Sequence, residues 1–113
     1  MHELAITQGV VDAVTEHTGA APVTCVRLRV GRLAGVVPEA MRFCFELVTA
    51  GTPLEGAVLE FERPEGRGRC RTCGQDVVLA DLILLCSCGS ADVEVLAGRE
   101  LAVASVVVAG PGR

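Results

Sequence analysis

The chain has 113 residues, half of them apolar, and a net charge of −4, which suits one compact domain, or one domain with a small appendage, whose modest core a metal ion or a disulfide can supplement. The negative charge, with three phenylalanines and no tyrosine or tryptophan, argues against a nucleic-acid-binding surface, which needs a basic face and stacking rings. No apolar run reaches the roughly 18 residues of a membrane span and no secretory signal is present, so a soluble protein in the reducing cytoplasm is expected.

The segment from Glu3 to His17 is predicted to form an amphipathic helix. Its apolar residues recur at spacings of three, four and seven, and Gly19 supplies a stop. The following stretch, VTCVRLRVG, alternates between apolar residues and arginines, which is typical of a half-buried strand. The residues of its apolar face are Val26, Leu28 and Val30.

A second helix is predicted to begin at Pro38, because proline suits the first helical position and Glu39 favours the positive end of a helix. Gly51 ends its apolar stripe, whose members are Met41, Cys44, Phe45, Leu47 and Val48. The stretch AVLEFE then alternates as a second strand. The helix between the two strands allows a crossover connection, so we expect them to be parallel.

The polar, glycine-rich stretch from Arg63 to Arg69 is interpreted as a linker into the cysteine-containing region. Beyond that region and a glycine near position 98, the valines of LAVASVVVA predict a third strand. The expected fold class is therefore α+β, with two helices packed on a three-stranded mixed sheet. A zinc-ribbon-like hairpin domain is expected as an insertion over residues 65–97, between the parts formed by residues 1–64 and 98–113.

The inserted region contains the pair Cys70 and Cys73 in a C-x-x-C arrangement and the pair Cys86 and Cys88 in a shorter C-x-C arrangement, each followed by glycine. Two such turns at the ends of a hairpin bring four thiolates into the tetrahedral cage that zinc accepts. We expect the hairpin strands at Val77–Leu79 and Leu82–Leu85. The shorter second turn leaves open whether both of its thiols bind the metal.

A closed cage of four cysteines has no open coordination position, so a structural role is favoured over a catalytic one. A disulfide, a buried thiol cluster and a rubredoxin-like iron site are the alternatives to zinc. Cys25, in the first strand, and Cys44, on the second helix, are interpreted as small buried apolar residues.

The first residues, MHELAI, raise a second possibility of metal binding. A histidine at position 2 can join the terminal amine and its own amide nitrogen in one chelate. On position alone, however, His2 is an ordinary solvated side chain, and Glu3 is what a first helical turn prefers. His17 lies on the polar face of the predicted helix and is expected to be exposed.

The full pattern resembles the HypA/HybF family of hydrogenase nickel-insertion accessory proteins. The resemblance covers essentially the whole chain and is carried by MHELAI, by VRLRVGRLAGVVPEAMRFCFELVTAGTPLEGAVLEFE, by RCRTCG and CSCGS, and by GREL before the last strand. One departure is C-S-C where the family usually has C-P-x-C.

The resemblance implies a non-enzymatic nickel metallochaperone for [NiFe] hydrogenase maturation. It implies transient Ni(II) binding at Met1, His2 and Glu3, in the α/β domain, and structural Zn(II) binding at the four cysteines. The implied partners are a HypB-type GTPase and the precursor of the [NiFe] hydrogenase large subunit. The chain is expected to act as a monomer or a homodimer, and some relatives also serve urease.

The chemistry of the terminus agrees with this implication. The terminal amine, the His2 amide and the His2 imidazole can occupy three corners of a square plane, which Ni(II) accepts and zinc does not favour. The Glu3 amide or carboxylate can close the fourth corner. GTP hydrolysis is assigned to the partner because the chain has no phosphate-binding G-x-x-x-x-G-K-[ST] loop.

Two rival functions fit parts of the sequence. A zinc-ribbon module for protein or nucleic-acid binding would need only the cysteines and would be indifferent to His2, and the acidic composition disfavours it. A small thiol redox enzyme acting through Cys70 and Cys73 would expose a reactive thiolate, which the two further cysteines nearby disfavour.

Overall fold

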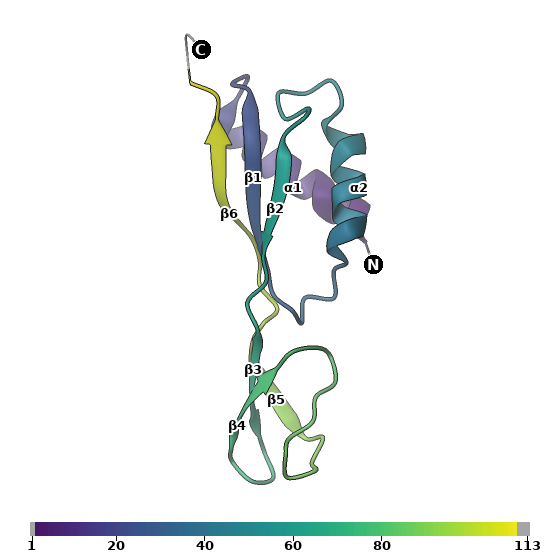
Figure 1. Cartoon of the computed structure of the whole chain (residues 1–113), viewed down its shortest axis with the longest axis vertical. Coiled ribbons are helices and arrows are strands. Elements are labelled where there is room, and N and C mark those ends of the chain that lie inside the picture. The colour runs from purple at the N-terminus through teal and green to yellow at the C-terminus, as the bar shows by residue number, and fades with distance from the viewer. Residues whose placement is uncertain (1, 111–113) are drawn as a thin grey trace. The chain divides into compact units, whose positions relative to one another are not determined.

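The computed structural model describes residues 2–110, and Figure 1 shows their path. In chain order the elements are α1 (Glu3–Thr18), β1 (Val23–Val30), α2 (Pro38–Thr49), β2 (Val58–Glu62), β3 (Gly66–Cys70), β4 (Asp76–Leu79), β5 (Val93–Ala97) and β6 (Leu101–Val108). The strands form two three-stranded sheets, one with the order β2-β1-β6 and the other with the order β4-β3-β5. The predicted α+β class, with both helices, is confirmed.

The first sheet is mixed, as predicted. The ion pairs Arg27–Glu60 and Arg29–Glu62 join β1 to β2 at a constant offset of 33 residues, which is the pattern of parallel strands. Between β1 and β6 the partners run in opposite directions: the Gly31 amide donates to the Glu100 carbonyl, whereas the Ala109 amide donates to that of Pro22. The middle strand therefore has one parallel and one antiparallel neighbour.

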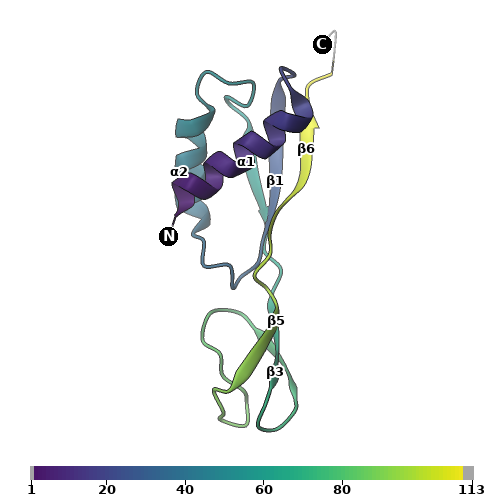
Figure 2. The same cartoon turned by 180° about the vertical axis from the view of Figure 1, so that it is seen from behind.

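The two helices pack on each other and against the sheet, and Figure 2 shows α1 lying across it with its C-terminal end beside β1 and β6. Large apolar side chains from both helices, from the strands and from the turn before β2 are buried: Val11, Val14, Val26, Leu28, Met41, Phe45, Leu54 and Leu59. Neither helix is long and apolar enough to cross a membrane, among the residues that the structure describes.

The buried face of α1 is more polar than the sequence pattern suggested. It consists of Glu3, Thr7, Val11 and Val14, which recur every three or four residues. Leu4, one of the apolar residues in the predicted helix, is 55% exposed. The Thr7 hydroxyl donates to the Glu3 carbonyl. The polar groups in the first turn of this buried face are therefore hydrogen-bonded, and apolar contacts contribute less there.

The second sheet corrects two expectations. The stretch interpreted as a linker contains β3, the central strand of this sheet, paired antiparallel with β4 on one side and β5 on the other. The expected hairpin partner at Leu82–Leu85 is not a strand, and β4 pairs with β3 instead. Leu82 and Ile83 are exposed, because they lie in a loop before the second pair of cysteines and not in a paired strand.

Close packing explains why β3 contains glycines. A Cβ atom on Gly68 would lie 2.7 Å from the Glu94 carbonyl oxygen and 2.8 Å from a methyl carbon of Val93, and one on Gly66 would lie 2.4 Å from a methyl carbon of Leu33. Both glycines are buried in β3, whose pairing with β5 shifts register between Arg67 and Gly68. The role of these glycines is to let neighbouring chain segments approach closely, and not to make β3 flexible.

The chain divides into two compact units. The first contains the residues up to Leu28, Val36–Phe61 and the residues from Val103 onward, and the second contains Arg29–Gly35 and Glu62–Ala102. The second unit includes 29–35, beyond the range expected for the inserted domain. Leu33 explains this, because it is buried in the cluster formed by Cys70, Leu79, Cys86 and Val93.

We predict that Gly68→Ala destabilises the second unit by about 1–3 kcal/mol, because the added methyl group overpacks a site bounded by backbone. The measurement is urea unfolding of the zinc-loaded variant followed by circular dichroism. Gly9→Ala is the control: Gly9 lies in α1 with nothing within 4 Å of an added Cβ, so this change is expected to stabilise by about 0.5–1 kcal/mol. A Gly68→Ala variant as stable as the parent chain would contradict the packing argument.

Candidate metal centres

The first cysteine pair sits in a tight turn that links β3 to β4. Cys70 is the last residue of β3, and its carbonyl accepts a hydrogen bond from the Gly74 amide at 2.8 Å while its amide donates to the Gln75 carbonyl at 2.9 Å. Gly74 has a φ of 79°, which favours glycine. The turn places Cys73 beside Cys70, and the Cys73 amide points at the Cys70 sulfur at 3.5 Å.

The second pair forms a turn of the same kind with one residue fewer. The Cys86 carbonyl accepts from the Gly89 amide at 2.9 Å, and the Cys86 amide donates to the Ser90 carbonyl at 2.9 Å. Gly89 also has a positive φ, of 94°. The shorter C-x-C turn therefore has the same two backbone hydrogen bonds that close the C-x-x-C turn. The sulfurs of Cys86 and Cys88 both reach the cluster.

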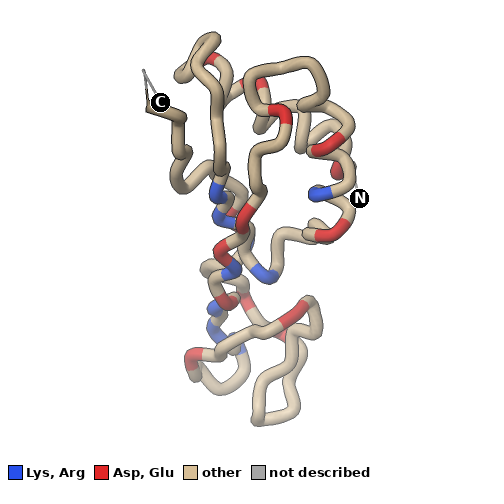
Figure 3. Tube along the Cα trace, turned by 45° about the horizontal axis from the view of Figure 1, so that its top comes forward, with Lys and Arg blue, Asp and Glu red and all other residues tan. Residues whose placement is uncertain are grey.

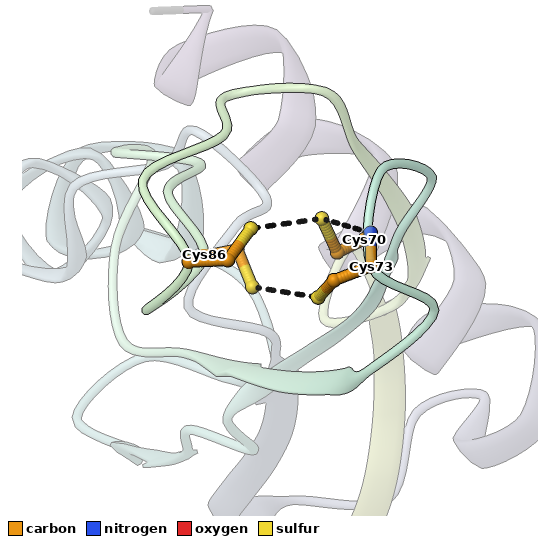
Figure 4. A group of neighbouring side chains, drawn as sticks. Cys70, Cys73 and Cys86 are labelled. Atoms are coloured by element: carbon orange, nitrogen blue, oxygen red, sulfur yellow. Dashed lines mark hydrogen bonds between the residues drawn. The ribbon is translucent and has the colours of Figure 1, made fainter.

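The four sulfurs converge, and Figure 4 shows those of Cys70, Cys73 and Cys86 turned toward one another. All four Sγ atoms lie within 4.8 Å of one another, with Cys70 and Cys88 3.7 Å apart and Cys73 and Cys86 3.6 Å apart. A tetrahedral zinc site with Zn–S distances of about 2.3 Å has sulfur–sulfur separations of about 3.8 Å. The geometry therefore fits zinc, and all four thiols are free rather than in disulfides.

The ionisation of the cluster also fits a cation. The Cys73 amide hydrogen bond, helped by that of Thr72, lowers the pKa of Cys70 to about 6. The Gln75 amide favours the Cys73 thiolate, but burial and the neighbouring Cys86 thiol raise the pKa of Cys73 to about 12. One thiol of the cluster therefore loses its proton readily, and the loss of a second proton is unfavourable. A bound divalent metal stabilises all of the thiolates together.

Two contacts around the cluster were not identified from the sequence. The Thr72 and Ser90 hydroxyls are hydrogen-bonded at 2.8 Å and so join the two cysteine turns directly. The side-chain oxygen of Gln75 lies 3.7 Å from the Cys86 sulfur and 3.3 Å from the Ser87 hydroxyl. In the sequence, these polar residues are marked only by their position, since each lies within or directly after a cysteine turn.

The other predicted metal-binding residues lie at the start of α1, in the first unit. Met1 is outside the described residues. His2 is the residue before the helix; it is exposed, and its side chain makes no capping hydrogen bond. Its carbonyl accepts the first helical hydrogen bond from the Ile6 amide at 3.0 Å, so the backbone is ordered while the imidazole remains accessible.

Glu3 has a structural role that the sequence did not indicate. Its carboxylate is buried and accepts a hydrogen bond at 3.1 Å from the amide of Val37, the residue before α2. The terminal amine and this Val37 hydrogen bond lower the pKa of Glu3 from 4.5 to about 2. The ionised form is therefore favoured by folding, and its stabilising effect is present above pH 4.5 and is lost as the pH falls toward 2.

The remaining cysteines and histidine lie outside both candidate centres. Cys25 and Cys44 are half-buried, in β1 and on α2, and burial together with Glu60 raises the pKa of the Cys25 thiol. His17 is exposed in the last turn of α1, as expected.

A family model described as "Hydrogenase/urease nickel incorporation, metallochaperone, hypA" matches residues 1–108. The chain belongs to the HypA family. Curated relatives named hydrogenase maturation factor HypA include one from Nostoc punctiforme, 44% identical over 108 residues, and one from Geotalea uraniireducens, 46% identical over 109 residues. These alignments cover 96% of this chain and 96% and 99% of the two relatives. The predicted family membership is confirmed.

Solved HypA structures have the same fold at much lower sequence identity. The solution structure of the nickel metallochaperone HypA from Helicobacter pylori matches with a TM-score of 0.64 at 18% identity, covering 96% of this chain and 97% of that one. A second solution structure of a HypA protein matches with a TM-score of 0.59. The family is thus one of nickel-incorporation metallochaperones for hydrogenase maturation, and its fold accommodates the shortened cysteine turn of this chain.

We predict that Cys88→Ser lowers zinc affinity by about 100-fold or more, because even the loss of a residue that supports a metal ligand costs about 10–100-fold. Zinc retained after a graded challenge with a chelator is measured by atomic absorption. Cys25→Ser, which removes a thiol outside the cluster, is the control and should retain zinc like the parent chain. Equal retention by the two variants would exclude Cys88 as a ligand.

Proposed function

We propose that this HypA family member carries Ni(II) at its N-terminus, on Met1, His2 and Glu3, and delivers it for maturation of a [NiFe] hydrogenase. The observation that carries the proposal is the exposed His2 imidazole, without a capping bond, at the residue directly before an ordered helix. A metal bound there is accessible to a second protein. Release to a partner, rather than a chemical reaction, is the activity that such a site supports, so the protein acts as a carrier and not as an enzyme.

The donors at this terminus are nitrogen atoms. The terminal amine, the His2 amide and the His2 imidazole together suit the square-planar coordination of Ni(II). The first amides of a helix have no carbonyl partner within the helix, so using them as ligands breaks no helical hydrogen bond. Amides and imidazole must lose protons to bind, so nickel affinity falls as the pH is lowered.

The Glu3 amide is a better fourth donor than the Glu3 carboxylate. The carboxylate is buried and occupied by the Val37 amide, and withdrawing it would leave that amide without its partner. The Glu3 amide, at the first helical position, has no carbonyl partner within the helix, and its hydrogen bond is to the carboxylate of its own side chain. We therefore assign nickel binding to the backbone of Glu3, and to its side chain the role of holding the start of α1 in place.

We propose further that Cys70, Cys73, Cys86 and Cys88 hold a structural zinc ion. The closed set of four sulfurs supports this role, because it leaves no position for nickel exchange or for a substrate. Zinc sites of this type contribute on the order of 10 kcal/mol to folding, a large term for a unit with a small apolar core. The two metals are then separated by ligand type, with thiolates for zinc and nitrogen donors for nickel.

The partners proposed for delivery are a HypB-type GTPase and the precursor of the hydrogenase large subunit, as the family membership suggests. The cytoplasm is the proposed location, since a cage of four thiolates persists in a reducing compartment. Neither nucleic acid nor a membrane is proposed as a partner.

The test is a Ni(II) titration, by calorimetry, of the zinc-loaded chain with its native start. His2→Ala should weaken binding about tenfold or more, which corresponds to at least 1.4 kcal/mol. His17→Ala is the matched control, because it removes the only other histidine, also exposed on α1, and should bind nickel like the parent chain. No extra residue may precede Met1, because a histidine in third place creates a different nickel chelate.

A Glu3→Gln variant separates the two possible fourth donors within the same experiment. If the backbone amide of Glu3 binds the metal, this variant keeps nickel affinity while the thermal stability of the first unit falls. Loss of nickel affinity without loss of stability would assign the carboxylate instead. If His2→Ala and His17→Ala bind nickel equally well, the proposal of an N-terminal nickel site is wrong.

A further inference from the structure

The two cysteine turns of the second unit are joined by polar side chains as well as by the cluster of sulfurs. Thr72 stands between Cys70 and Cys73 in the first turn. Ser90 closes the second turn, because its carbonyl accepts a hydrogen bond from the Cys86 amide at 2.9 Å. The Thr72 and Ser90 hydroxyl oxygens are 2.8 Å apart and share a hydrogen bond. Ser90 therefore belongs to the backbone of one turn and contacts the other turn through its side chain.

A second set of contacts joins the same two turns through neighbouring residues. The Arg71 amide donates to the Asp92 carbonyl at 2.9 Å, and the Arg71 guanidinium donates to the Asp92 carboxylate at 2.8 Å. The Asp92 amide donates to the Ser90 hydroxyl oxygen at 3.1 Å, and a hydroxyl that accepts one hydrogen bond can still donate its own hydrogen. Arg71, Thr72, Ser90 and Asp92 thus form one connected network, called here the polar clasp.

The second turn depends on the polar clasp because no strand leads into it. Residues 80–85, which precede the turn, lie outside any strand or helix. On the other side of the turn, β5 begins only at Val93. Ser90 and Asp92 lie between the last cysteine and this strand. The clasp therefore fixes the second turn at a point where the sheet does not.

The hydrogen bond between the two hydroxyls is the part of the clasp that we expect to matter most. Figure 3 shows basic and acidic residues interspersed in the second unit. The Arg71 and Asp92 side chains are 55% and 60% exposed, so water and salt screen the attraction between their charges. The Thr72–Ser90 hydrogen bond joins uncharged groups, and Ser90 is half-buried. Salt therefore does not weaken this bond.

Small molecules can reach the sulfur cluster without any opening of the chain. Cys73 and Cys88 are exposed, and a cavity of about 460 Å³ beside the second turn has Gln75, Cys86 and Ser87 in its lining. A competing ligand can therefore approach a metal held by these sulfurs, so access does not limit release of the metal. Release requires the sulfurs to move apart, and they lie on the two turns that the clasp joins.

We infer that the polar clasp holds the two cysteine turns together and slows the release of zinc. The inference rests on the proposed zinc site and identifies residues outside its ligand set that control it. Thr72 and Ser90 act as positioning residues, since they keep the two cysteine pairs at the spacing that four-sulfur coordination needs. A sulfur that leaves the metal stays close to it, at a high effective concentration, and binds again before zinc escapes.

The test is the rate at which the zinc-loaded full chain transfers zinc to an excess of the chromogenic chelator 4-(2-pyridylazo)resorcinol. Thr72→Val removes the hydroxyl at nearly constant volume and is expected to speed transfer about threefold to tenfold, as for the loss of one hydrogen bond. Thr72→Ser keeps a hydroxyl and should transfer zinc like the parent chain. Thr24→Val is the matched control, because Thr24 is an exposed threonine of β1 in the first unit.

A double-mutant cycle distinguishes positioning by one shared bond from separate losses of stability. Ser90→Ala should speed transfer at least as much as Thr72→Val, because it also removes the acceptor of the Asp92 amide. Combining Thr72→Val with Ser90→Ala should be no faster than Ser90→Ala alone, since both changes remove the same bond. Two residues that stabilise the unit independently would instead give effects that multiply.

The absorption of the Co(II)-loaded chain separates failure of the clasp from failure of the zinc proposal. All variants should keep the sulfur-to-cobalt bands of a four-thiolate site, because neither Thr72 nor Ser90 is a ligand. A parent chain that retains no zinc and lacks these bands overturns both proposals. Retained zinc with equal transfer rates for the parent chain and Thr72→Val overturns the clasp alone. So do effects that multiply in the cycle, a Thr72→Ser variant as fast as Thr72→Val, or loss of the bands in Thr72→Val.

Discussion

The hydrogen bond from the Val37 amide to the Glu3 carboxylate fixes the beginning of α1 against the beginning of α2, and the position of the N-terminus depends on it. The bond joins residues 34 positions apart in the sequence, and the carboxylate that accepts it is buried. One residue earlier, the His2 side chain is exposed. Glu3 is thus fixed by its hydrogen bond, whereas the neighbouring His2 is accessible. This arrangement suits a site that must be ordered enough to bind a metal and open enough to release it.

The second unit is organised around a different constraint. Its strands are short and its apolar core is small, so much of its core consists of the cysteines themselves: Cys70 and Cys86 are buried with Leu33, Leu79 and Val93. The sulfurs that can bind a metal are thus also part of the packing. In the proposed function, zinc serves the fold of this unit while the other unit carries nickel, and neither centre needs the ligand type of the other.

Much of this architecture could be predicted from local patterns. Both helices and the strands β1, β2 and β6 follow from residue spacing, and the cysteine pairs follow from their spacing and the glycines behind them. The strand β3 could not be predicted, because Gly66 and Gly68 are typical of a flexible segment. Their reason lies in distant residues: Leu33 and Glu94 occupy the space that a side chain would need. The structural role of Glu3 was missed for the same reason, since its partner is Val37.

The central claim is that two metals occupy two separate sites with different donors. X-ray absorption at the nickel and zinc edges of the chain loaded with both metals tests this most directly. The account predicts nickel surrounded by nitrogen donors in a planar arrangement and zinc surrounded by four sulfurs at about 2.3 Å. Sulfur in the nickel shell, or nitrogen replacing sulfur around zinc, would contradict it.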